Sequence, residues 1–83
     1  MNNKIQLDSN NGKFTKKALH QLEETGLAIV VDDEVCYYHV EAKSYLLCAS
    51  TDDVHMAVKI ILSNVDKEYL EKLVDKESIS LSK

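Results

Sequence analysis

The sequence predicts an α+β fold in which a small antiparallel sheet packs against two or three helices. Three of the four tyrosines lie between Leu27 and Ser50, together with a run of β-branched residues. Two charged clusters, Asp32–Glu34 and Glu41–Lys43, divide this stretch into three apolar runs of strand length, as in an antiparallel meander. The flanking segments carry apolar residues at helical spacing, so we expect helices to cover one face of the sheet.

The length and composition indicate a single folded domain spanning residues 1–83. A chain of 83 residues buries only about 60% of the surface that it exposes when unfolded, so the core is expected to be small. Its 45% hydrophobic and 29% charged residues are ordinary for a folded protein. No apolar run approaches the roughly 20 residues that span a bilayer, and the N-terminus lacks the apolar core of a signal peptide. We therefore expect a cytoplasmic protein without membrane association.

The two cysteines, Cys36 and Cys48, are expected to be reduced thiols in that compartment. Two cysteines are too few for the disulfide framework of a small secreted protein. A three-residue hairpin loop at Glu41–Lys43 would nevertheless place these cysteines directly opposite each other on neighbouring strands, where a bond is geometrically conceivable.

The segment before the sheet is predicted to contain a short strand and one helix. Residues 4–7 alternate polar and apolar, which favours an edge strand before the turn-forming residues 8–12. The helix is expected from about Thr15 to Thr25, with the Thr15 hydroxyl as its N-terminal cap and Gly26 as the left-handed residue that ends it. The apolar positions with helical spacing are Phe14, Ala18, Leu19 and Leu22.

The three predicted strands differ in pattern. Leu27–Val31 is apolar on both faces, which favours a central position in the sheet. Val35–Val40 alternates, so that its odd-numbered residues share one face and its even-numbered residues the other. Ser44–Ser50 alternates less clearly, and as an edge strand it could pair with a second copy of itself in a homodimer.

Two further helical segments are predicted after the sheet. A serine or threonine cap at Ser50 or Thr51, followed by Asp52 and Asp53, marks the first helix start. A second amphipathic segment, 69–74, is either separate or a bent continuation of the first helix. The tail at 79–81 alternates again, so that it either returns as an edge strand beside residues 4–7 or frays. The apolar stripe of the first helix consists of Val54, Ala57, Val58, Ile61 and Val65.

The charge pattern argues against sequence-specific DNA binding. The net charge is −4 and all ten basic residues are lysines, whereas most such readers use the forked contacts of arginine. Lysine in place of arginine, without proline or tryptophan, is typical of an AT-rich coding sequence and suggests a low-GC bacterium or its phage.

The sequence contains no motif for catalysis, a cofactor or a metal. Cys36 and His39 are an odd number of residues apart and project from opposite faces of a strand, so they do not form a ligand pair. Gly12 and Gly26 stand alone and do not form a phosphate-binding loop. We therefore expect a non-enzymatic protein without cofactors.

Two segments resemble elements of transcriptional regulators. Leu22–Leu27, a charged turn and Tyr37–Val40 resemble the end of the recognition helix and the wing of winged-helix regulators, which implies DNA binding. The turn at Asp32–Glu34 is acidic, however, where contact with DNA requires positive charge. Phe14–Leu47 resembles Phd/YefM-type antitoxins in its helix, Glu-Glu-x-Gly turn and hairpin. That resemblance implies that Ser44–Leu47 begins a helix and that the following segment binds a toxin.

Clusters of carboxylates lead us to predict a protein–protein interaction module with a basic partner. The specific hypothesis is a phage or mobile-element inhibitor that occupies the nucleic-acid-binding site of a host protein, similar in general type to small anti-CRISPR proteins. The alternative is an antitoxin or transcriptional regulator. The predicted partner-binding residues are Glu23, Glu24, Asp32, Asp33, Glu34, Asp52 and Asp53.

Overall fold

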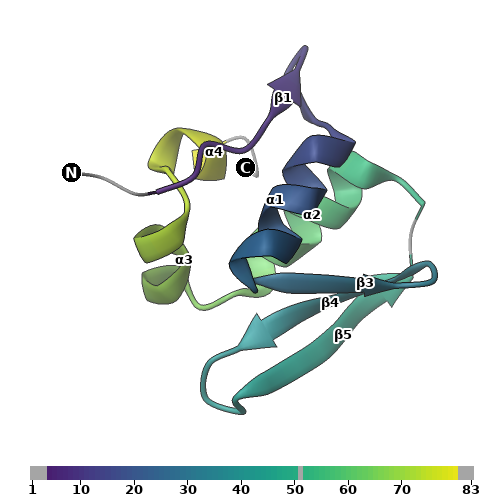
Figure 1. Ribbon diagram of the computed structural model, residues 1–83, viewed down its shortest axis with the longest axis vertical. Coiled ribbons are helices and arrows are strands. Elements are labelled where there is room, and N and C mark those ends of the chain that lie inside the picture. Colours follow the sequence, from purple (N-terminus) through teal and green to yellow (C-terminus); the bar gives the residue numbers. More distant parts are fainter. Residues whose placement is uncertain (1–3, 51, 81–83) are drawn as a thin grey trace.

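A computed structural model describes residues 4–50 and 52–80 and confirms the α+β fold (Figure 1). Its elements in chain order are β1 (Ser9–Asn10), β2 (Lys13–Phe14), α1 (Lys16–Thr25), β3 (Ala28–Val31), β4 (Glu34–His39), β5 (Ser44–Ser50), α2 (Val54–Asn64), α3 (Lys67–Leu73) and α4 (Lys76–Ser80). Strands β3, β4 and β5 form an antiparallel sheet, and β1 and β2 form a separate hairpin. Helices α1 and α2 lie together over one face of the three-stranded sheet, and α3 and α4 lie beside them.

The three apolar runs predicted as strands all form the meander. The third run, Ser44–Ser50, pairs with β4 at every residue except Cys48, so the helix implied here by the antitoxin resemblance is wrong. The reason is that each residue of β4 from Glu34 to His39 has a partner in this run. Local apolar spacing in a seven-residue run does not distinguish a strand from a helix, whereas pairing does.

The predicted central position of the first meander strand is wrong. The strand order is β3-β4-β5, so β4 is central and β3 is an edge. In β3, Ala28 is buried on the face toward the helices, whereas Ile29 and Val31 are exposed on the other face. An apolar strand normally has both faces covered, but here one apolar face is open to solvent.

The chain before α1 forms a tight hairpin. Asn11 (φ 54°) and Gly12 (φ 77°) both have left-handed backbone conformations, as a two-residue turn of type I′ requires. Ser9 lies opposite Phe14, and the Phe14 side chain is buried in the core. In residues 4–15 the structure therefore has a hairpin, whereas a winged helix requires further helices.

Helix α1 begins after Thr15, as predicted, but not by the predicted contact. The Thr15 hydroxyl donates a hydrogen bond to the Asp8 carboxylate and does not cap the helix. At the other end Gly26 (φ 82°) confirms the predicted left-handed stop. The N–H of Leu27 donates to the Leu22 carbonyl oxygen over 3.1 Å, so the chain turns directly from α1 into β3.

Helix α2 is capped by Asp53 rather than by Ser50, which belongs to β5, or by Thr51, which lies outside the described residues. The Asp53 carboxylate accepts a hydrogen bond from the Met56 N–H over 3.1 Å. Extended backbone at Val65 ends α2, and Asp66 caps α3 by accepting from the Glu68 N–H. The segment left open as separate or continuous is therefore a separate helix.

The N-terminal segment is held by the C-terminal helices. Ile5 forms a parallel bridge with Val74, in which the Ile5 N–H donates to the Leu73 carbonyl oxygen over 2.9 Å. The Leu7 N–H donates to the Ser78 hydroxyl over 2.8 Å in a buried position. The predicted returning strand at 79–81 is wrong, because Ile79 belongs to α4; Leu81 lies outside the described residues.

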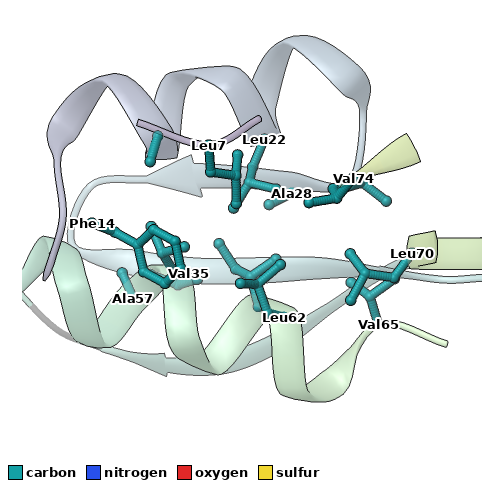
Figure 2. Close-up of a cluster of buried hydrophobic side chains, with 14 residues drawn as sticks. Leu7, Phe14, Leu22, Ala28, Val35, Ala57, Leu62, Val65, Leu70 and Val74 are labelled. Carbon is teal, nitrogen blue, oxygen red and sulfur yellow. The ribbon is translucent and has the colours of Figure 1, made fainter. Parts of the chain in front are cut away.

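A single core lies between the inner sheet face and the helices (Figure 2). Val35 from β4 packs against Phe14 and Ala57, and Leu70 and Val74 close the core near α3. The fully buried large side chains are Leu22, Leu27, Val35, Val58, Ile61, Leu70 and Val74. Every element except β1 and β5 supplies at least one buried side chain, so most of the chain contributes to one small core.

The contact between Leu7 and Ser78 predicts a specific loss of stability. Ser78→Ala leaves the buried Leu7 N–H without its acceptor, so we expect the free energy of unfolding to fall by about 1–3 kcal/mol. Each kcal/mol lowers the midpoint of thermal unfolding of a chain this size by roughly 4–8 °C. Ser63→Ala is the control, because Ser63 is exposed and its loss should change stability by less than about 0.5 kcal/mol. Equal thermal unfolding midpoints for the two variants would contradict a stabilising role of the Leu7–Ser78 hydrogen bond.

Candidate functional site

The sheet face that α1 and α2 leave uncovered is apolar. Pleating puts Ile29 and Val31 on the face opposite the buried Ala28, and register aligns Cys36 of β4 with Leu47 of β5. The exposed fractions are 36% for Ile29, 54% for Val31 and 59% for Leu47. We call this the outer face; its residues are Ile29, Val31, Cys36, Tyr38, Tyr45 and Leu47.

Aromatic contacts order one end of the outer face. The Tyr38 ring lies edge-on to Tyr45, with ring centroids 5.4 Å apart, and 5.7 Å from Tyr69 of α3. The Tyr45 hydroxyl donates to the Gly26 carbonyl oxygen over 2.8 Å. Tyr45 therefore reaches from the β5 edge across to the start of β3, and its side chain is held in one position. Such contacts make the face a preformed surface.

Five of the seven predicted carboxylates lie at one end of this sheet. Glu34 is opposite Ser50 in the register, so the β3–β4 turn and the β5–α2 connection lie at the same end. The left-handed conformation of Asp32 (φ 56°) forms the tight turn. We call this the acidic end; its residues are Asp32, Asp33, Glu34, Asp52 and Asp53, all of them exposed.

The other two predicted residues lie elsewhere. Glu23 and Glu24 lie in the last turn of α1, at the end of the sheet where β3 begins, opposite the acidic end. A Glu23 carboxylate oxygen lies 3.8 Å from Nδ1 of His20 on the same helix. The predicted partner-binding set is thus divided into one group of five and a separate pair.

The two cysteines lie close together without being directly opposite. The β4–β5 connection has four residues, Val40–Lys43, so Cys36 is opposite Leu47, and Cys48 occupies a bulge. The expectation of a direct cross-strand pair is therefore wrong by one residue. Both are free thiols. Burial, together with the nearby Cys36, raises the pKa of Cys48 from 9.0 to about 11, although a backbone hydrogen bond from Tyr37 opposes the shift.

A polar depression of about 250 Å³ lies between the β4–β5 connection and the α2–α3 connection. Its lining residues are His39, Val40, Glu41, Asn64 and Asp66. His39 Nδ1 accepts a hydrogen bond from the Ala42 N–H, and the Asn64 amide donates to the Ile60 carbonyl oxygen. Among the described residues, no hydrogen bond connects His39 with the carboxylate of Glu41 or Asp66.

The described residues contain neither a metal-binding cluster nor a membrane-spanning helix. In residues 4–50 and 52–80, no three His, Cys, Asp or Glu side chains converge in a way that could hold a metal ion. None of the helices in this part of the chain is long and apolar enough to cross a membrane.

Comparisons with protein-family models, with curated proteins and with solved structures find no match for this chain.

The functional prediction from sequence missed the apolar part of the surface. Exposed apolar residues look like core residues in a sequence, and Ile29, Val31 and Leu47 were assigned to strands without a partner role. The available signal is the two-sided apolar pattern of β3, which fits an exposed apolar face as well as a central strand. The two long helices, α1 and α2, both lie on the inner face, so Ile29, Val31 and Leu47 on the other face stay exposed.

The raised pKa predicts slow alkylation of Cys48. Because only the thiolate reacts, a pKa of about 11 instead of 9.0 leaves about 100-fold less reactive thiolate at pH 8. Mass spectrometry of alkylated peptides measures the rate at Cys48 separately, with circular dichroism confirming that the chain stays folded at each pH. The pH at which the alkylation rate of Cys48 reaches half its maximum gives the pKa of this thiol. In Cys36→Ser this pKa should fall but stay above 9.0, because burial is the larger cause of the shift. A pKa at or below 9.0 in the wild-type chain refutes the prediction.

Proposed function

We propose that this protein is a non-catalytic interaction module that binds a basic partner protein through its outer face and acidic end. The observation that carries the proposal is that these two surfaces adjoin. Val31 of the outer face is followed directly by Asp32 and lies opposite Glu34 in the register. An exposed apolar patch with charged residues at its rim is typical of protein-binding surfaces.

The apolar and acidic parts have different roles in this proposal. Side chains such as Leu47 and Val31, each more than half exposed, supply the area whose removal from water favours association. The carboxylates attract a basic partner, speed the encounter and set its orientation. Together they select a partner surface that is both basic and partly apolar.

A nucleic-acid-binding protein is the class of partner that fits best. The nucleic-acid-binding site of such a protein is rich in Lys and Arg that contact phosphates. The five carboxylates of the acidic end present negative charge in place of those phosphates. We therefore propose an inhibitor that competes with nucleic acid for that site. Direct DNA binding fits the outer face poorly, because the turn that would serve as a wing carries Asp32, Asp33 and Glu34.

Removal of the turn carboxylates tests the proposal. Tagged wild-type chain is used to recover partners from a lysate of the cells that encode it, and the affinity for a recovered nucleic-acid-binding protein is measured. The triple variant Asp32→Asn, Asp33→Asn, Glu34→Gln should bind it about tenfold more weakly, since each exposed ion pair contributes about 0.5 kcal/mol. Double-stranded DNA should compete with the wild-type chain for that partner.

The control is Glu23→Gln with Glu24→Gln, which removes two charges at the opposite end of the sheet. We expect this variant to bind as the wild type does. A loss of affinity per removed charge as large as in the triple variant would indicate that only net charge matters and would contradict the proposal. Retention of the purified chain on DNA with steep salt dependence would instead support the regulator alternative.

A further inference from the structure

The two edges of the sheet differ in ways that bear on self-association. Strand β3 is an edge of four residues, whereas β5 is an edge of seven, and within the described residues β5 pairs only with β4. Natural proteins protect sheet edges by short strands, by charges, by proline or by covering segments. Ser44–Ser50 has no charge, proline or glycine, so the longer edge has the fewest of these protections.

Strand β5 also has exposed apolar side chains on both of its faces. Tyr45 and Leu47 point to the outer face, whereas Leu46 lies opposite Tyr37 on the face toward the helices. Leu46 is nevertheless 38% exposed, so the helices do not fully cover β5 at this position. A strand added beside β5 would therefore bury apolar surface above and below the sheet and satisfy unpaired backbone groups.

We propose that β5 pairs antiparallel with β5 of a second copy of this chain, forming a six-stranded sheet across a twofold axis. The bulge at Cys48 leaves Ser44–Leu47 as the regular part of the strand. Opposing residues share a face only if the axis passes through a residue, and an axis at Leu46 pairs all three exposed apolar side chains of this part, Tyr45, Leu46 and Leu47, with one another. Leu46 then meets its copy on the helix side, and Tyr45 meets Leu47 on the outer face.

The charges at the ends of β5 select the antiparallel direction. Lys43 immediately precedes the strand, and Asp52 and Asp53 follow it closely. Antiparallel pairing brings Lys43 of each copy beside Ala49 and Ser50 of the other, toward that copy's acidic end. Parallel pairing would place the two acidic ends side by side, where like charges repel.

The dimer does not depend on the proposed partner, but it changes which surfaces one partner could contact at the same time. An axis perpendicular to the sheet leaves both outer faces on the same side and the two acidic ends at opposite extremes. The interface consists of one strand pair, and its buried area is well below that of a standard stable complex. The fraction of dimer is therefore expected to depend on concentration. It doubles the apolar surface that one partner could contact.

Sedimentation of the full chain over a hundredfold range of concentration tests the dimer. The wild-type mass should rise toward twice the 9.4 kDa of one chain. Leu46→Lys and Leu46→Glu each place like charges face to face at the axis, so each variant alone should remain at 9.4 kDa. An equimolar mixture of the two should recover the dimer, because opposite charges then meet at the axis.

Ile29→Lys is the matched control, since Ile29 lies on β3, the other edge of the sheet. This variant should dimerise as the wild type does and should weaken partner binding, whereas Leu46→Lys should abolish dimerisation. Circular dichroism confirms that each variant is folded. A wild-type chain that stays monomeric throughout, or a Leu46→Lys chain that still dimerises, overturns the proposal whether or not the proposed partner is found.

Discussion

The structure depends on the packing of two helices against one face of a three-stranded sheet. Leu22 of α1 and Ile61 of α2 are fully buried there, and Val35 of the central strand lies beneath them. A chain of 83 residues buries a small fraction of its surface on folding and forms one small core, and here that core lies on one side of the sheet. The sharp turn at Gly26 follows from the same packing, because α1 must lead directly into β3 to lie above it.

One-sided packing also determines which parts of the sheet are exposed. The inner sheet face is part of the core, whereas the outer face and the β5 edge have exposed apolar side chains. The β3–β4 turn and the β5–α2 connection meet at one end of the sheet because the meander reverses direction at each strand. The acidic end is therefore a product of topology, assembled from residues about twenty positions apart.

The terminal segments complete the core through polar contacts that have no local signature. Ile5 pairs with Val74, and the Leu7 N–H is satisfied by a hydroxyl 71 residues later in the sequence. In a similar way, His55 of α2 accepts a hydrogen bond from the Phe14 N–H and stacks on its ring. Each contact satisfies a backbone group that a small core would otherwise bury unpaired.

Local chemistry determined which segments are helix and strand: the left-handed Gly26 ended α1, and the charged turns separated three extended runs. These features depend on near neighbours, so sequence alone revealed them. Tertiary structure decided that β4 is central, that Cys48 occupies a bulge and that Ile29, Val31 and Leu47 face solvent. Burial of an apolar side chain lowers the free energy of the folded chain whichever surface covers it. The sequence near that side chain therefore does not specify which surface will cover it.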